Sequence, residues 1–178
     1  TAKIITVFNQ KGGVGKSTIA MQLAGALGLR GKVVKVIDMD RQSTATAWAA
    51  VAAEAGRPFP AEVSSKHPFG AHIAKEIERM ASGADFIVVD CPPAIDSPVA
   101  AAALVMADVA LIPIPPRPAD YQSSQAAKQL ALQSKTLNPD LKVLVVANMV
   151  DTSSSSAKEI LAKMQEDEET PLAKSRLG

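Results

Sequence analysis

Cysteine, aromatic residues and long apolar runs are scarce in this 178-residue chain. The single cysteine, Cys91, excludes a disulfide within the chain and a Cys-x-x-Cys metal site, which agrees with a reducing cytoplasm. Because aromatic residues make up only 3% of the chain, a core must be built mainly from Ala, Val, Ile and Leu. The longest uninterrupted apolar run, from Pro98 to Ala107, is too short to span a membrane.

The chain also lacks an excess of either positive or negative charge. The chain carries 19 Lys and Arg residues and 18 Asp and Glu residues, so its formal net charge is +1. This balance argues against a protein that binds polyanions with its whole surface, and DNA binding would need a local basic patch. The length fits one domain, residues 1–178.

Short apolar segments that suit strands alternate with helical segments. This order predicts parallel pairing through right-handed crossovers, and therefore an α/β three-layer sandwich with a mostly parallel sheet. In such a sheet, ligands bind at the carboxyl ends of the strands. We expect strands at 3–9, 33–38, 86–90, 109–114 and 143–148, with a candidate last strand at 171–176. We expect helices at 16–29, 44–54, 72–80, 99–106, 121–137 and 157–165. The segment 56–68 is predicted to be a loop with at most one short strand.

A glycine-rich loop follows the first of these strands, where residues 8–18 read Phe-Asn-Gln-Lys-Gly-Gly-Val-Gly-Lys-Ser-Thr. Its glycines allow backbone N–H groups to turn toward one anion, and the helix that begins near Lys16 adds the positive end of its dipole. Lys16 can reach the β- and γ-phosphates of a nucleotide, and Ser17 or Thr18 can hold Mg²⁺. The pattern is that of a Walker A loop, G-x-x-x-x-G-K-[ST], with Gln10 at the first glycine position.

A second lysine, Lys11, lies inside this loop. One lysine is enough for the phosphates of the bound nucleotide, and the stem of Lys11 can point away from that nucleotide. A cation there could reach a phosphate held by a facing subunit, as an arginine finger does. The alternative is a solvated surface lysine.

Aspartates end two of the predicted strands. Asp38 and Asp40 follow the second strand, and on an extended chain two carboxylates two residues apart point the same way, toward Mg²⁺ or an attacking water. Asp90 ends the strand Phe-Ile-Val-Val-Asp in the manner of a Walker B strand, whose aspartate holds Mg²⁺ through water. The alternative in both places is an aspartate that forms a turn at a strand end.

Asn148 ends a later strand, and its amide offers the donor and acceptor that suit the edge of adenine. The segment 115–121 nearby could shape a pocket for the base. An asparagine that merely ends a strand is the alternative. Trp48 lies a turn after the Asp40 loop, and we expect it in the core or at a subunit interface.

The loop Lys-Gly-Gly-Val-Gly-Lys-Ser-Thr resembles the deviant Walker A motif of the ParA/MinD family of P-loop ATPases, and the chain as a whole looks most like the short ParA-type plasmid partition proteins. The segment Asp38 to Gln42 resembles the family's D-x-D-P-Q, with Arg41 in place of proline. The segment Asp90 to Pro93 resembles its D-x-P-P switch.

The resemblance implies a role for each matching residue. It implies ATP and Mg²⁺ as cofactors, with Lys11, Lys16 and Asp40 in the catalytic set and Asp40 placing the hydrolytic water. Mg²⁺ would be held by Ser17, Asp38 and Asp90. The nucleotide would be bound by Gly12, Gly13, Val14, Gly15, Lys16, Ser17 and Thr18 of the loop and by Asn148.

The same resemblance implies a Mg-dependent ATPase that drives plasmid or chromosome partition. ATP would close a sandwich homodimer that binds DNA without sequence preference, and a ParB-type centromere-binding protein would stimulate slow hydrolysis. The protein would be cytoplasmic and associated with the nucleoid. Candidate DNA contacts, where the family places its DNA surface, are Lys158, Lys174 and Arg176.

The alternative function is a MinD-like ATPase that positions an assembly on a membrane surface or another cargo. Such a protein needs a terminal amphipathic helix to lie on a membrane, and none is visible, so we expect no membrane partner. The family usually continues into another helix after the position of Gly178, so part of the basic surface is expected to be missing from this chain.

Overall fold

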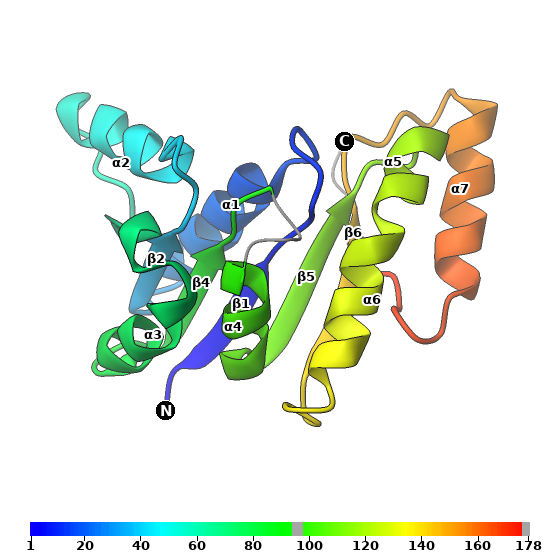
Figure 1. Ribbon diagram of the computed structural model, residues 1–178. Coiled ribbons are helices and arrows are strands. Elements are labelled where there is room, and N and C mark those ends of the chain that lie inside the picture. The colour runs from blue at the N-terminus through cyan, green and yellow to red at the C-terminus, as the bar shows by residue number, and fades with distance from the viewer. Residues whose placement is uncertain (94–97, 176–178) are drawn as a thin grey trace.

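The computed structural model describes residues 1–93 and 98–175. Within these residues, one six-stranded sheet has the order β3-β2-β4-β1-β5-β6, and every strand pair in it is parallel. Helices cover both of its faces (Figure 1). The predicted α/β three-layer sandwich is confirmed, and its sheet is wholly parallel rather than mostly so. The strands are β1 (Lys3–Val7), β2 (Val34–Asp38), β3 (Glu62–Ser65), β4 (Phe86–Asp90), β5 (Val109–Ile114) and β6 (Lys142–Ala147).

The helices follow the predicted order. Two of them, at 16–29 and 44–54, have the predicted bounds, and the predicted loop at 56–68 contains β3 as its one short strand. In the described residues they are α1 (Lys16–Leu29), α2 (Thr44–Glu54), the 3₁₀ helix η1 (His67–His72), α3 (Ile73–Ala81), α4 (Pro98–Met106), α5 (Pro118–Ser123), α6 (Gln125–Ser134) and α7 (Ser155–Glu166).

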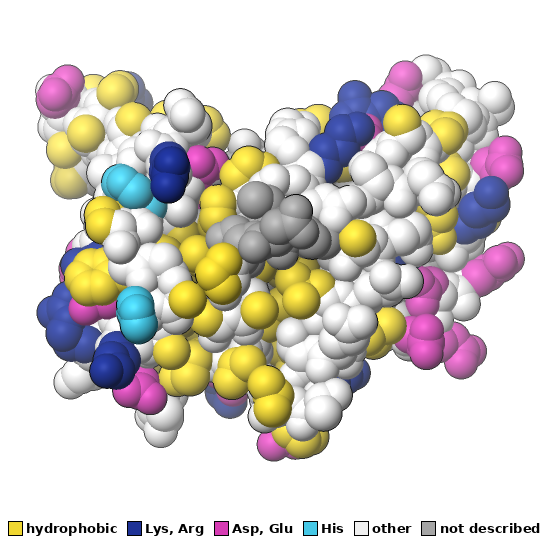
Figure 2. All heavy atoms as spheres, in the orientation of Figure 1, with side chains coloured by type: hydrophobic (Ala, Val, Ile, Leu, Met, Phe, Trp, Pro, Cys, Tyr) yellow, Lys and Arg dark blue, Asp and Glu magenta, His cyan; other side chains and the backbone are white. Residues whose placement is uncertain are grey.

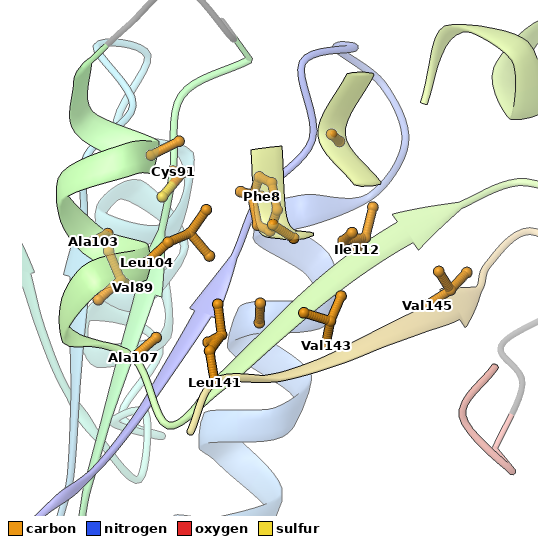
Figure 3. Packing of buried hydrophobic residues seen from close by; sticks show 14 of the residues in the cluster. Phe8, Val89, Cys91, Ala103, Leu104, Ala107, Ile112, Leu141, Val143 and Val145 are labelled. Carbon is orange, nitrogen blue, oxygen red and sulfur yellow. The ribbon is translucent and has the colours of Figure 1, made fainter. Parts of the chain in front are cut away.

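The sheet separates two apolar cores. On one face α3, α4, α6 and α7 pack over residues such as Phe8, Val89 and Ile112 (Figure 3). On the other face α1 and the start of α2 cover Val7 and Val36. Because the inner strands are buried on both faces, their sequences are continuous apolar runs instead of alternating ones.

The helix predicted at 121–137 is two helices that meet at Ser124. The first begins at Pro118, a position where the missing proline N–H is no loss. The hydroxyl of buried Ser124 donates to the carbonyl oxygen of Asp120 at 2.6 Å. This side chain therefore competes for the acceptor of the preceding turn, which bends a helix at that point.

The prediction of a strand at 171–176 is wrong for residues 171–175, the part that the structure describes. The described part of this segment makes one isolated parallel bridge, between Leu172 and Val145, with a backbone hydrogen bond on each side of it. Pro171 has no N–H to donate, which limits the pairing that it can support. Arg176 lies outside the described residues.

Gly28 on α1 is a point of close backbone approach, which generates a stability prediction. A Cβ atom at this position would lie 2.0 Å from the carbonyl oxygen of Pro60, whereas at Gly25 the nearest atom would be in the ring of Phe59 at 3.2 Å. We expect Gly28→Ala to lower the free energy of unfolding by about 1–3 kcal/mol, because the backbone must move.

Gly25→Ala is the matched control on the same helix. A ring can shift and alanine favours a helix, so this variant should stay within about 1 kcal/mol of the unmodified chain. Urea unfolding followed by circular dichroism checks both variants. Equal stabilities for the two would contradict the role assigned to the Pro60 contact.

Candidate functional site

The predicted motifs meet at the carboxyl edge of the sheet, where β1, β2 and β4 lie side by side. Asp90 is in register with Val7 on one side and with Asp38 on the other. Figure 2 shows this edge hollowed between the projecting α2 and the side that carries α5 and α7. A cavity of about 270 Å³ here is lined by Gly12, Gly13, Gly15, Lys16, Ser17, Thr18, Asp40, Thr44, Trp48 and Pro93.

The glycine loop has the backbone that its sequence predicts. Gly13 and Gly15 have φ angles of 73° and 92°, in the left-handed region that side chains disfavour. Gly15 is the N-cap residue of α1 and has no side chain with which to cap it, so no N-cap side chain occupies the first N–H groups of the helix. This arrangement suits an anion such as a phosphate group.

Gly15 is required for a second reason, which is its contact with Asn148. A Cβ atom on Gly15 would lie 2.1 Å from the amide nitrogen of Asn148. That amide is buried and donates to the carbonyl oxygen of Val14 at 2.9 Å. Asn148 therefore supports the glycine loop directly, a contact that the sequence did not reveal.

Lys16 is buried at the start of α1 with 7% of its surface exposed. Its Nζ donates to the carbonyl oxygen of Lys11 at 2.8 Å. Burial lowers the pKa of the ammonium group, while the negative charges of Asp90 and Asp40 oppose this shift. A buried ammonium group makes a stronger hydrogen bond to an anionic acceptor than to a neutral carbonyl. A phosphate bound in the loop would provide such an acceptor.

Asp90 is fully buried but has few hydrogen-bond partners. Its Oδ2 accepts a hydrogen bond from the Ser17 hydroxyl at 2.6 Å, and its Oδ1 is buried without a hydrogen-bond partner in the described residues. Burial raises the pKa of this carboxyl to about 7, and Asp38 adds to the rise, against the Ser17 hydrogen bond and the Lys16 charge.

These two residues, Ser17 and Asp90, fit Mg²⁺, which prefers hard oxygen ligands and keeps several waters. The unpartnered Oδ1 of Asp90 is the kind of atom that a metal-bound water satisfies, and the Ser17 hydroxyl lies beside it. In the described part of the chain, no three His, Cys, Asp or Glu residues are grouped so that they could hold a metal ion. Mg²⁺ would therefore take most of its ligands from phosphates and water.

Asp38 is fully buried and turned toward the backbone that follows it. Its carboxylate accepts hydrogen bonds from the N–H of Asp40 and from the N–H and hydroxyl of Thr46, all at 3.0–3.1 Å. β2 ends at Asp38, so Asp40 lies beyond the extended strand, and the expectation that the two carboxylates point the same way stays a prediction. Asp38 thus has the turn-forming contacts of the alternative interpretation, while Asp40 lines the cavity.

Trp48 is not a core residue, since 46% of its surface is exposed. Trp48 lines the cavity beside the glycine loop and also a shallow hollow with Val51 and Arg57 on the outer face of α2. Cys91, by contrast, is fully buried in the core, as a small packing residue would be.

A second cavity of about 290 Å³ follows the ends of β5 and β6. Its lining includes Pro116 and Arg117, together with Met149 directly after Asn148. The expectation that 115–121 borders a pocket near Asn148 agrees with this cavity. Sequence reasoning missed Met149, Asp151 and Ser154, which also line this cavity, because no motif marks them.

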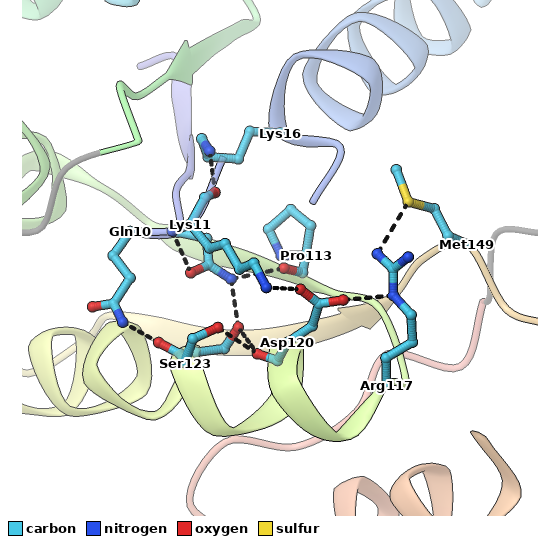
Figure 4. Close-up of polar contacts among 10 residues, drawn as sticks. Gln10, Lys11, Lys16, Pro113, Arg117, Asp120, Ser123 and Met149 are labelled. Carbon is cyan, nitrogen blue, oxygen red and sulfur yellow. Dashed lines mark hydrogen bonds and ion pairs between the residues drawn. The ribbon is translucent and has the colours of Figure 1, made fainter. Parts of the chain in front are cut away.

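Lys11 does not extend freely from the loop. Its Nζ lies 2.5 Å from Oδ1 of Asp120 in the same chain, as Figure 4 shows. The neighbouring Gln10 donates its side-chain amide to the carbonyl oxygen of Ser123. No sequence pattern indicated these contacts, since α5 lies far along the chain from the glycine loop.

Two of the three predicted DNA-contacting residues are described by the structure, and neither of them lines the cavity beside the glycine loop. Lys158 is exposed on α7, and Lys174 is exposed after the bridge to β6. Arg176, the third of them, is outside the described residues.

Among the helices that the structure describes, none combines the length and apolar character needed to cross a membrane.

Comparisons with known proteins place the chain among nucleotide-binding proteins. It is 28% identical over 154 residues to maintenance of carboxysome distribution protein A of Halothiobacillus neapolitanus, a match that covers 86% of this chain and 69% of that protein. The protein of the same name from Gloeobacter kilaueensis is 37% identical over 119 residues, covering 66% of this chain and about half, 51%, of that relative. The chromosome-partitioning ATPase Soj of Thermus thermophilus is 29% identical over 190 residues, covering 90% of this chain and 75% of that protein.

Solved structures share the fold. Cobyrinic acid a,c-diamide synthase from Mycobacterium smegmatis with bound ADP and magnesium superposes with a TM-score of 0.83 at 18% identity, over 99% of this chain and 86% of that one. The model of the CobQ/CobB/MinD/ParA nucleotide binding domain matches residues 5–175. With the glycine loop, the buried Asp90 and this match in agreement, the chain belongs to the CobQ/CobB/MinD/ParA nucleotide-binding family.

Proposed function

We propose that this chain is a Mg-dependent ATPase of the ParA type that moves DNA during plasmid or chromosome partition. The family's P-loop proteins of the ParA/MinD type are ATPases, and the observation that carries the proposal is the pair formed by Ser17 and the half-satisfied carboxylate of Asp90. The pair lies beside a loop whose N–H groups suit phosphates. Relatives include a chromosome-partitioning ATPase, which supports the partition role.

In this proposal the glycine loop, Lys16 and the acids of the site have separate roles. The N–H groups of residues 12–18 hold the β- and γ-phosphates, and Lys16 transfers its hydrogen bond from the Lys11 carbonyl to a phosphate oxygen. Mg²⁺ would be held by Ser17 and, through water, by Asp90, and when bound it neutralises charge on the phosphates. Asp38 fixes the segment to Thr46, and Asp40 orients the attacking water.

The base would lie toward the ends of β5 and β6. The cavity beside Asn148 is lined by Pro116, Arg117 and Met149 and has room for a planar ring. The Asn148 amide already donates to the glycine loop, so we assign two roles to this side chain. It supports Val14, and it contacts the adenine edge with its remaining hydrogen-bonding capacity.

The larger assembly is part of the same proposal. ATP would close a homodimer, the dimer would bind DNA without sequence preference on the nucleoid in the cytoplasm, and a ParB-type protein would stimulate hydrolysis. Exposed Lys158 and Lys174 are the described candidates for phosphate contacts. Residues 1–178 would act as one ATPase domain.

A second candidate function is the positioning of a large cargo other than a replicon. The relatives named for carboxysome distribution favour it, because they match this chain at 28% and 37% identity. Both functions use the same ATP site. They differ in the partner that stimulates hydrolysis and in the cargo that the partner carries.

Lys16→Ala tests the phosphate site. Loss of a buried ammonium that contacts phosphate removes charge-assisted hydrogen bonds, each worth about 1.5–3 kcal/mol, so ATP affinity should fall at least about tenfold. Isothermal titration calorimetry with Mg-ATP measures this. Lys75→Ala, an exposed lysine on α3, is the control, and equal affinity of the two variants would sink the assignment.

Asp40→Ala tests the hydrolytic step. ATP affinity and the ATP dimer should be kept, while turnover should fall about 10²–10⁴-fold because the attacking water loses its acceptor. Phosphate release and sedimentation velocity measure the two properties. Asp140→Ala removes an exposed acid before β6, at the opposite edge of the sheet, and should leave turnover unchanged. Normal turnover in Asp40→Ala would rule out its role.

The DNA proposal is tested by a salt series with a non-specific duplex, in ATP and in ADP. Binding should need ATP and fall steeply with salt, and each of Lys158→Ala and Lys174→Ala should reduce the slope of log K against log salt by about 0.9. Fluorescence anisotropy of a labelled duplex is the measurement. Absence of binding in both nucleotide states would contradict the partition role and favour the cargo-positioning function.

A further inference from the structure

Asp120 is a single buried carboxylate with two cations. One of its oxygens lies 2.5 Å from Lys11 Nζ, and the other lies 2.5 Å from Arg117 Nε (Figure 4). The side chain of Asp120 is 6% exposed, whereas those of Lys11 and Arg117 are 39% and 57% exposed. The anion is therefore fixed in the protein, and each cation can leave toward solvent.

The backbone around this cluster is held by contacts that do not involve the Asp120 carboxylate. The side-chain amide of Asn9 donates to the carbonyl oxygen of Pro113 and to the hydroxyl of Ser124, both at 2.9 Å. The amide of Gln10 donates to the carbonyl oxygen of Ser123. The start of the glycine loop is thus attached to α5 whether or not Lys11 remains paired.

Arg117 decides whether Lys11 can leave at a moderate energetic cost. Removal of the only partner of a buried carboxylate is strongly destabilising. Here Arg117 stays on the second oxygen, so the charge of Asp120 remains compensated when Lys11 departs. The cluster has one more positive than negative charge, and a phosphate group of a nucleotide can compete for the surplus cation.

We propose that Asp120 holds Lys11 in a resting position in the nucleotide-free chain, and that Lys11 leaves it for the phosphates of a nucleotide bound by a second copy of this chain. Asp120 is then a positioning residue that acts through Lys11 and sets how readily the ATP dimer forms. The second step rests on the proposed function, since it needs that dimer. The first step concerns the single chain alone.

The resting contact is measured without nucleotide. Burial raises the pKa of the Asp120 carboxyl, but the hydrogen bonds and charges of Lys11 and Arg117 outweigh this and hold the pKa below its ordinary value. Lys11→Ala should therefore raise the pKa of Asp120 in a carboxyl ¹³C NMR titration. Lys75→Ala should not change it. An unchanged titration in Lys11→Ala would overturn the resting contact.

The release step is measured by sedimentation velocity at saturating Mg-ATP. Asp120→Asn keeps the shape and the backbone but removes the charge, so the dimer should form about tenfold more tightly while Asp120→Glu restores the unmodified behaviour. Lys11→Ala should lose the dimer, and the double variant Lys11→Ala with Asp120→Asn should lose it too, because the gain acts through Lys11. A dimer that is unchanged or weaker in Asp120→Asn would overturn the proposal.

Arg117→Ala gives the opposite sign and does not depend on the folding of the Asp120 variants. With Arg117 gone, Lys11 becomes the only partner of the carboxylate and should be held more firmly, so the dimer should weaken at saturating ATP. A tighter dimer in this variant would contradict the proposal. Failure of the unmodified chain to dimerise with ATP would instead refute the proposed function and the release step with it, while the NMR titration still decides the resting contact.

Discussion

The site depends on a negative charge that is buried with too few partners. Asp90 lies at the carboxyl end of β4, between β1 and β2, and one of its oxygens has the Ser17 hydroxyl while the other has no hydrogen-bond partner in the described structure. A carboxylate in this position is costly to keep ionised, as its pKa of about 7 reflects. Positive charge near Asp90 therefore stabilises its ionised form, whether that charge comes from Lys16, from Mg²⁺ or from the N-terminus of α1. The parallel register of the three strands buries the Asp90 carboxylate. The glycine loop places positively charged groups and N–H donors beside it.

The two aspartates near Asp90, Asp38 and Asp40, have different structural roles. Asp38 uses all of its described hydrogen bonds to fix the turn and the beginning of α2, so it controls where Asp40 lies rather than facing the cavity in the same way. Movement of this turn would carry Asp40 and Trp48 together, since both lie on the segment that Asp38 fastens and both line the cavity. The position of Asp40 in the cavity and the shape of the outer face of α2 are thereby linked through one carboxylate.

Much of the fold and of the nucleotide site could be predicted from the sequence because the signals are local. Continuous apolar runs predict buried parallel strands, and a glycine loop between a strand and a helix predicts an anion site at that helix. The contacts that were missed join segments far apart in the chain. Nothing near Lys11 indicates Asp120, and nothing near Gly15 indicates that the Asn148 amide fills the space of its missing side chain. The break at Ser124 was missed because a serine hydroxyl bonding to the preceding turn leaves the helical periodicity intact.

Trp48 gives the molecule a built-in optical probe. It is the only tryptophan of the chain, it is half exposed, and its indole borders the cavity formed by Lys16, Ser17 and Asp40. Indole emission responds to the polarity of its surroundings, so both occupation of the cavity and burial of the outer face of α2 would change the intrinsic fluorescence of the unlabelled protein. The same residue thus makes events at the phosphate end of the site visible in real time, without a dye or an engineered label.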